Sequence, residues 1–178
     1  MIEDIRAHIF QEEERLLLDT NIWLFTYGPI SYRRQNGADV YNQALANISI
    51  NKCKVYICSI IISEFINRCI DEELRLLGIS KSDRKAFRKL PVFRPIAEKI
   101  ILYVEDIMSF ARSCDFKFDS LKVQAFLNEF KNGSLDYNDI IIEDVCKTNS
   151  LILVTNDADF KNSPVPLLTA NRRMYLEE

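Results

Sequence analysis

Histidine is almost missing from this chain, and its scarcity narrows the possible chemistry. The 178 residues contain one histidine, His8, in a charged N-terminal segment where we expect it at the surface. Histidine-based acid–base catalysis and histidine-rich metal sites are therefore not expected. The five cysteines form no C-x-x-C pair and no zinc spacing, which argues against structural zinc and favours a reducing compartment such as the cytoplasm.

Long apolar runs and a strong net charge are also absent. No apolar run approaches the roughly 20 residues that cross a membrane, and the N-terminus MIEDIRAHIFQEEER is too charged for a signal peptide. We therefore expect a cytoplasmic protein with no membrane partner. The net charge of −3 means that a polyanion would have to be bound by a local basic patch or by a metal.

Short β-rich or apolar runs alternate with helical patterns along the chain. The predicted strands are 16–19, 54–58, 115–119, 151–155 and 164–168. The predicted helices are 2–14, 22–27, 40–50, 59–77, 96–112, 120–130 and one opened by Asp136. Ser59 is a plausible N-cap, and Pro164 and Pro166 favour an edge position for the last strand. This alternation predicts a single α/β domain over residues 1–178 with a mostly parallel central sheet of four to five strands.

The most informative stretch is Leu16–Phe25, LLLDTNIWLF. Its first apolar run is typical of a strand buried on both faces. Asp19 follows that strand directly, and ligands of open α/β sheets bind at the carboxyl ends of strands. Asp19 is therefore a candidate site residue. The alternative is that Asp19 or Thr20 only caps the next helix.

Three further acids occupy similar positions, each with an ordinary alternative. Glu64 lies about one turn into the helix after the second strand, where it could complement the helix dipole. Asp139 begins the helix YNDIIIEDVC and has cap-box spacing to Asp136. Asp157 follows the strand LILVT, in a segment that could be simple turn chemistry.

Together, these four acids indicate a cation site. Two carboxylates about 4 Å apart repel each other by roughly 4 kcal/mol at an effective dielectric near 20, so a fold that gathers several of them needs a counterion. An all-oxygen ligand set without histidine or thiolate favours Mg²⁺ or Mn²⁺ over zinc or copper. We therefore predict Asp19, Glu64, Asp139 and Asp157 as metal ligands and catalytic residues.

The order and spacing of LLLDTNIWLF, SEF, NDIIIEDVC and LVTNDADF resemble those of the PIN-domain ribonucleases, which include VapC-like toxins. The resemblance spans roughly residues 16–168. It implies a three-layer α/β/α sandwich, Mg²⁺- or Mn²⁺-dependent cleavage of RNA, and supporting roles for Asn21, Thr155, Asn156 and Asp159. Asp136 and Glu143, one helical turn either side of Asp139, are weaker candidates. By analogy, an antitoxin protein and a second copy of this chain are candidate partners.

A basic segment departs from compact members of this family. About 74 residues separate Glu64 from Asp139, and we interpret residues 78–112 as a helical, basic insertion. Residues 81–99 carry seven basic and two acidic side chains, a local net charge of +5. Arg84, Lys85, Arg88 and Lys89 are candidate RNA contacts, with Phe87 and Phe93 as stacking faces. The alternative is a solvated helix face with two core phenylalanines.

Two other functions compete with a metal-dependent endoribonuclease. A catalytically silent PIN-like module could bind RNA or protein without cutting. A different Mg²⁺ enzyme, such as a phosphatase of the haloacid-dehalogenase type, would need D-x-D-x-T at the first strand, whereas this chain has Asp19-Thr20-Asn21-Ile22. No G-x-x-x-x-G-K-[ST] phosphate loop occurs, so nucleotide hydrolysis of that kind is disfavoured.

Overall fold

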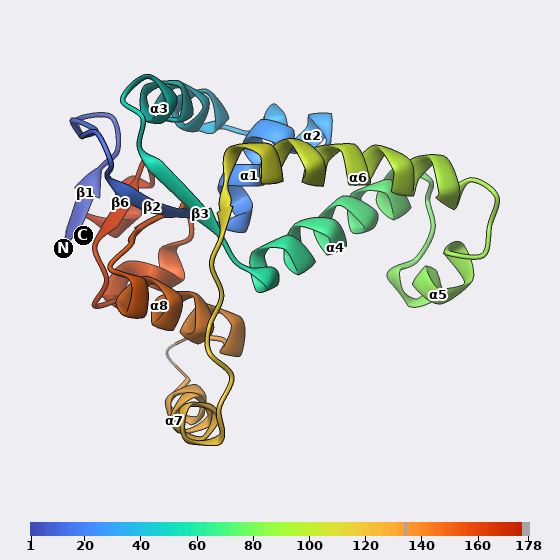
Figure 1. Ribbon diagram of the computed structural model, residues 1–178. Helices are drawn as coiled ribbons and strands as arrows, with labels where there is room; N and C mark the ends of the chain where they lie inside the picture. Colours follow the sequence, from blue (N-terminus) through green and yellow to red (C-terminus); the bar gives the residue numbers. More distant parts are fainter. Residues whose placement is uncertain (134, 176–178) are drawn as a thin grey trace.

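A parallel sheet lies between layers of helices in the computed structural model, which describes residues 1–133 and 135–175 (Figure 1). Within these residues the sheet has six strands in the order β1-β6-β5-β2-β3-β4. The strands are β1 (Ile2–Asp4), β2 (Arg15–Leu18), β3 (Lys54–Ile57), β4 (Arg112–Ser113), β5 (Ile152–Val154) and β6 (Leu167–Thr169). All neighbouring strands are parallel. The predicted α/β class is confirmed, and the strand count corrects the expected four to five.

Helices cover both sides of this sheet. They are α1 (Thr20–Tyr27), α2 (Ile30–Arg33), α3 (Ala38–Ile50), α4 (Ser59–Leu76), α5 (Arg84–Phe87), α6 (Phe93–Phe110), α7 (Ser120–Lys131) and α8 (Tyr137–Asn149), with short 3-10 helices η1 (Lys81–Asp83), η2 (Ala158–Asn162) and η3 (Arg172–Met174). Figure 1 shows α3 on one side of the sheet and α8 on the other. In the described part of the chain, no helix combines the length and apolar character needed to span a membrane.

A helical arm extends from the sheet. Helices α4 and α6 lie side by side and lead away from the strands, and α5 lies at their far end (Figure 1). The arm contains most of the segment 78–112 that the sequence marks as helical and basic.

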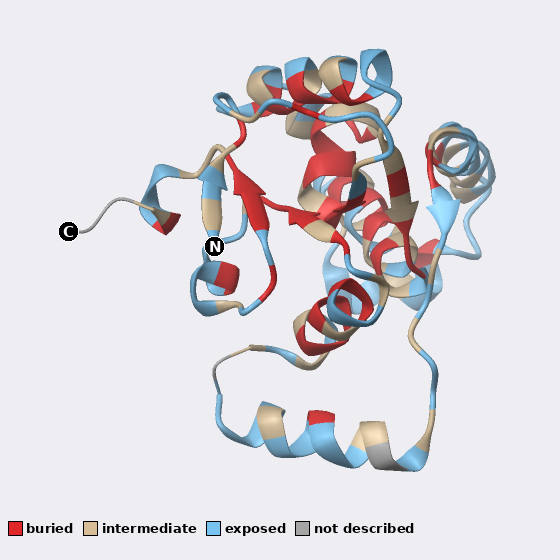
Figure 2. Cartoon of the chain, turned by 60° about the vertical axis from the view of Figure 1, so that its left-hand side comes forward, coloured by how far each residue is buried: buried red, intermediate tan, exposed pale blue. Residues whose placement is uncertain are grey.

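The centre of the sheet explains why the apolar run before Asp19 is a strand. Leu16, Leu17 and Leu18 of β2 are fully buried, as a strand covered on both faces requires. Trp23 of α1 is fully buried as well, and its indole N–H donates to the backbone oxygen of Leu18 at 2.9 Å. Figure 2 shows this buried interior running through the strands and the inner faces of the helices.

The topology places a crevice between β2 and β5. From β2 the chain adds β3 and then β4 on one side, and it returns to add β5 and β6 on the other. The connections therefore diverge at the β2–β5 boundary, and ligands of open α/β sheets bind at the carboxyl ends of the strands at such a point. Asp19 follows β2, and Thr155 follows β5.

The predicted N-terminal helix over residues 2–14 is wrong. Residues Ile2–Asp4 form the edge strand β1, which pairs with β6 in the register Ile2↔Leu167, and turns and irregular backbone follow it. The backbone N–H of Leu167 also donates to the oxygen of Met1 at 2.9 Å. The sheet edge supplies these long-range hydrogen bonds, and no local pattern of apolar residues encodes them.

The predicted strand at 115–119 is also wrong, because its aspartates serve as helix caps. Asp115 accepts a hydrogen bond from the N–H of Ser59 at 3.1 Å, and Asp119 accepts one from the N–H of Lys122 at 2.8 Å. The strand lies just before, at Arg112–Ser113, beside β3. The N-cap position of α4 is Cys58, one residue before the expected cap at Ser59. The N–H of Ser59 is instead bound by Asp115.

The last strand does not lie at an edge. β6 lies between β5 and β1, although Pro164 and Pro166 favoured an edge. Both prolines precede Leu167, the first residue of the strand, so their missing N–H groups fall outside its ladder. The oxygen of Pro166 still accepts from the N–H of Leu153 at 2.9 Å.

Candidate functional site

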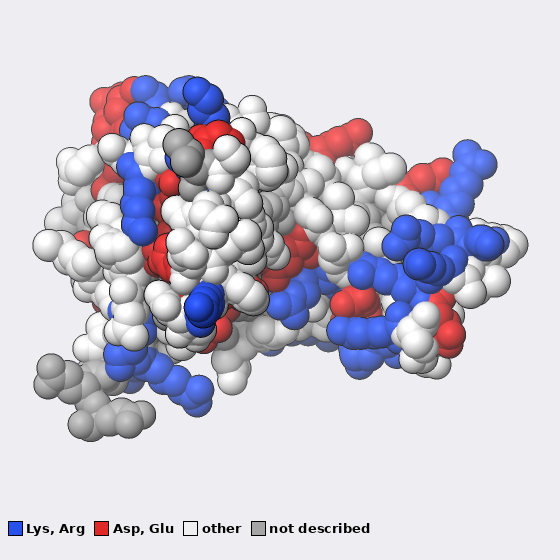
Figure 3. All heavy atoms as spheres, turned by 90° about the horizontal axis from the view of Figure 1, so that it is seen from below, with Lys and Arg blue, Asp and Glu red and all other residues white. Residues whose placement is uncertain are grey.

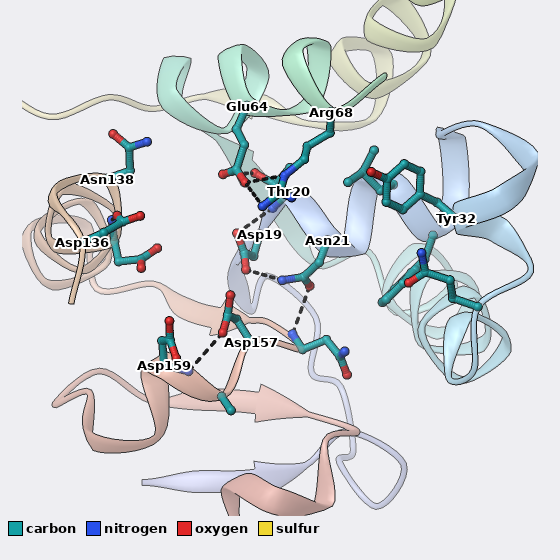
Figure 4. A pocket seen from close by; sticks show the side chains of 16 residues that line it. Asp19, Thr20, Asn21, Tyr32, Glu64, Arg68, Asp136, Asn138, Asp157 and Asp159 are labelled. Carbon is teal, nitrogen blue, oxygen red and sulfur yellow. Dashed lines mark hydrogen bonds and ion pairs between the residues drawn. The ribbon is translucent and has the colours of Figure 1, made fainter. Parts of the chain in front are cut away.

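An acidic cleft of about 570 Å³ opens beside the carboxyl ends of β2 and β5. Six acidic side chains and one basic side chain are among the residues that line it. They are Asp19, Glu64, Asp136, Asp139, Asp157, Asp159 and Arg68. Figure 4 shows Asp19 near the centre, Glu64 and Arg68 reaching in from α4, Asp136 at the start of α8, and Asp157 and Asp159 after β5. The structure thus brings all four predicted ligands to one cleft.

The register of the sheet fixes Asp19. Leu18 of β2 pairs with Val154 of β5, so the next residues, Asp19 and Thr155, are neighbours. The Thr155 hydroxyl donates to Oδ2 of Asp19 at 2.7 Å, and the side-chain amide of Asn21 donates to the same oxygen at 2.6 Å. The N–H of Thr20 donates to Oδ1 at 2.6 Å. The capping alternative is therefore real, since Asp19 caps α1 while its carboxylate also lines the cleft.

Asp19 is held in an unusual electrostatic state. Its side chain is almost completely buried. Burial, with a smaller contribution from the negative charges of Glu64 and Asp157, raises the pKa of its carboxyl to about 6, against the opposing effect of the hydrogen bonds from Thr155 and Thr20. A cation beside Asp19 would remove this penalty.

Glu64 has both carboxylate oxygens occupied by protein donors. Oε2 accepts from the hydroxyl of Thr20 at 3.1 Å. Oε1 accepts from two guanidinium nitrogens of Arg68, each at 3.2 Å, with the two residues one helical turn apart on α4. Glu64 thus does more than complement a helix dipole. The sequence analysis does not identify Arg68 as a site residue, because its i,i+4 spacing from Glu64 does not indicate that the pair faces a cleft.

Asp139 and Asp136 enter the cleft from the start of α8. Asp136 caps the helix, because its Oδ1 accepts from the N–H of Asp139 at 3.0 Å, as the cap-box spacing predicted. Asp139 lines the cleft, and its carboxylate forms no hydrogen bond with the described residues. Burial, together with the nearby charges of Asp136, Asp19, Asp157 and Glu64, raises the pKa of Asp139 to about 8.

The segment after β5 carries the predicted supporting residues. Asp157 caps η2 by accepting from the N–H of Asp159 at 3.0 Å, and its own N–H donates to the Thr155 hydroxyl at 3.0 Å. The N–H of Asn156 donates to Oδ1 of Asn21 at 3.0 Å. Thr155 therefore links Asp157 to Asp19, while Asn21 links Asp19 to Asn156.

A buried tyrosine, which no sequence pattern marks as a site residue, holds this segment in place. The hydroxyl of Tyr41, on α3, donates a hydrogen bond to Oδ1 of Asn156 at 2.9 Å and accepts one from the N–H of Ala170 at 2.9 Å. It is also 3.2 Å from the backbone oxygen of Thr155. Tyr41 is fully buried, so it positions the residues behind the cleft and does not line it.

The remaining weaker candidate lies away from the cleft. Glu143 is buried on α8 with its Oε2 3.0 Å from the ammonium of Lys147, and it is not among the residues that line the cleft.

The four basic candidates lie on α5 and just after it, on the helical arm; they are Arg84, Lys85, Arg88 and Lys89. Phe87 is 1% exposed, so the prediction that its ring offers a stacking surface for RNA bases is wrong.

A model of the PIN domain family matches residues 16–165. The chain belongs to the PIN domain family. A search among curated proteins found no match. Among solved structures, this PIN domain is similar to VapBC2 from Rickettsia felis, crystallised with a DNA fragment of its promoter, at 20% identity and a TM-score of 0.56, covering 86% of this chain and 97% of that one. It is also similar to PAE2754 from Pyrobaculum aerophilum at 15% identity and a TM-score of 0.51, covering 93% and 96%. These likenesses support the fold.

The oxygen ligands in the cleft of this PIN domain suit a hard divalent ion. Carboxylate oxygens predominate, and a divalent ion would offset the burial and the neighbouring charges that raise the pKa values of Asp19 and Asp139. Among residues 1–133 and 135–175, no three histidine, cysteine, aspartate or glutamate side chains form a ready-made metal site. Mg²⁺ is commonly held by one or two carboxylates and several waters. The separated carboxylates of this cleft fit such partly hydrated binding.

Proposed function

We propose that this PIN domain is a Mg²⁺- or Mn²⁺-dependent endoribonuclease. The observation that carries the proposal is the convergence of Asp19, Glu64, Asp139 and Asp157 on one cleft at the β2–β5 boundary. We assign these four carboxylates as metal ligands, some of them through bound water, and as catalytic residues. Asn21, Thr155, Asn156, Asp159 and Asp136 have supporting roles, because they hold those carboxylates or the backbone beside them.

The chain supplies rigidity and charge for phosphodiester hydrolysis. Asp19 offers carboxylate oxygens held by three donors, whereas the Asp139 carboxylate forms no hydrogen bond with the described residues. A bound divalent ion supplies Lewis-acid stabilisation of negative charge on the phosphate and lowers the pKa of water. Water adds to phosphorus, one P–O ester bond breaks, and the products are a phosphate monoester and a free hydroxyl. Asp139 or Asp157 would accept the proton that this water loses.

We extend the proposal to the biological setting. One of the similar structures is named as VapBC2 bound to its promoter DNA, and this likeness supports a role as the toxin of a toxin–antitoxin pair. An antitoxin protein and a second copy of the chain are then the proposed partners, with RNA as substrate. We also propose a cytoplasmic location.

Removal of divalent ions is expected to abolish cleavage. Without a cation, the six acids of the cleft repel a phosphodiester, so the protein in EDTA should leave single-stranded RNA intact, and added Mg²⁺ or Mn²⁺ should restore cleavage. The measurement is product formation on denaturing gels, with protein freed of metal by chelation and dialysis.

A parallel binding measurement separates the competing functions. RNA that is bound but never cut at any metal concentration would support the silent module and contradict the nuclease. Cleavage that persists at full rate in EDTA would contradict the assigned metal chemistry.

A further inference from the structure

Ion pairs divide the basic residues of the helical arm into two groups. Lys81 and Arg84 both approach Asp71, at 3.0 and 3.7 Å, while Arg94 pairs with Glu98 and Lys99 with Glu73. Lys85, Arg88 and Lys89 are exposed and make no ion pair among the described residues. We call these three the basic surface. Figure 3 shows Lys and Arg side chains gathered at the end of the molecule that carries α5.

Arg84 has a different task from its neighbours. Its Nη2 donates to the backbone oxygen of Asn67 at 3.0 Å and to the side-chain oxygen of the same residue at 2.9 Å. Beside it, Phe87 is buried and meets Phe93 edge to face, with ring centroids 5.5 Å apart. Arg84 and Phe87 therefore pack α5 against α4 and α6. Because its guanidinium is bound to Asn67, Arg84 is not available to bind RNA.

These contacts connect the basic surface to α4, the helix that brings Glu64 and Arg68 to the acidic cleft. Asn67, which accepts from Arg84, immediately precedes Arg68, the basic residue of the cleft. Glu64 lies three residues before Asn67, about 5 Å along the helix axis at 1.5 Å per residue. An RNA strand that leaves the cleft past Arg68 and continues along the arm would reach the segment that presents Lys85, Arg88 and Lys89.

We propose that the basic surface binds the phosphate backbone of single-stranded RNA whose scissile bond lies in the cleft. The proposal rests on the proposed nuclease function and specifies how its substrate is engaged. An acidic cleft in a protein of net charge −3 gives a polyanion no general attraction, so local cations must supply it. An acidic protein partner is the competing occupant, but the contact of this segment with α4, the helix that brings Glu64 to the cleft, favours RNA.

The experiment measures the salt dependence of RNA binding. A fluorescein-labelled single-stranded RNA of mixed sequence is titrated by anisotropy in Mg²⁺, with Asp139→Asn as the parent to prevent cleavage. Each phosphate contact on a single strand contributes a slope of about −0.7 in log K against log salt. Replacing Lys85, Arg88 and Lys89 with Ala should therefore weaken binding and make the slope shallower by about 2.

Two controls isolate the position of the charges. Lys52→Ala/Lys117→Ala/Lys131→Ala removes the same charge from three other exposed sites, and it should leave the slope close to that of the parent. Lys85→Arg/Lys89→Arg keeps the charge and should retain the parent slope. Circular dichroism confirms that each variant is folded.

An unchanged slope in the triple Ala variant, or no RNA binding by the parent, would overturn the proposal. An equal loss in both triple variants would also overturn it, because only net charge would then matter. The measurement follows binding and not cleavage. If the wild-type protein cuts no RNA and the triple Ala variant still loses slope, the nuclease assignment fails while the basic surface stands.

Discussion

Asp139→Asn is expected to lower metal-dependent RNA cleavage by about 100-fold or more without loss of the fold. Asp139 lies in the cleft at the start of α8, where its pKa is raised to about 8 by burial and by neighbouring acids. Asparagine has the same shape but cannot carry the charge that balances a divalent ion. The measurement is the initial rate of RNA cleavage in saturating Mn²⁺, together with the circular dichroism spectrum.

The same helix offers a matched control for this substitution. Asp144 also lies on α8, where it pairs with Lys122 at 2.7 Å, and it does not line the cleft. Asp144→Asn should cut RNA at a rate close to that of the wild type. If Asp139→Asn is as active as Asp144→Asn, Asp139 has no role in the reaction.

In EDTA, the stability of the protein is expected to fall as the pH rises from about 4 to about 8. Over this window the folded protein keeps a proton on Asp139, whose pKa is raised from 3.8 to about 8, while the unfolded chain releases it. Stability falls with pH wherever the folded state binds more protons. Asp19, with its pKa raised to about 6, acts in the same direction up to that pH.

A comparison with Asp139→Asn isolates this effect from other titrating groups. The pKa of His8 is also raised, despite burial, by its hydrogen bonds to Glu14 and Glu3, and the stability it contributes is likewise lost with rising pH. In EDTA, Asp139→Asn should melt above the wild type at pH 9, with a gap that closes toward pH 5. Each 1 kcal/mol corresponds to about 2–4 °C for a protein of this size. A gap independent of pH would contradict the charged cleft.

Much of the site could be predicted because it depends on sheet topology. A fully apolar strand such as Leu16–Leu18 belongs in the centre of a parallel sheet, and a residue that follows it must lie at the carboxyl edge. The same argument applies to Asp157 after β5. The expected convergence of these acids on one cleft therefore followed from the order of strands and helices.

What could not be predicted depends on contacts between distant parts of the chain. Asp115 looked like part of an alternating strand, but it caps α4 from 56 residues away. The strand Ile2–Asp4 exists because β6 offers it an edge. Arg68 was indistinguishable from other arginines on α4, and Arg84 from the exposed cations beside it. Tyr41 could be recognised only when its hydroxyl was placed against Asn156.

The binding of Mn²⁺ to the metal-free protein, measured by isothermal titration calorimetry, tests the central claim most directly. Asp19, Glu64, Asp139 and Asp157 are expected to act together, so the wild type should bind Mn²⁺ saturably while Asp19→Asn and Asp139→Asn each bind at least about 10-fold more weakly. Asp144→Asn should bind like the wild type. Equal Mn²⁺ affinity in all four proteins, or no binding by the wild type, would contradict a shared divalent ion in the cleft.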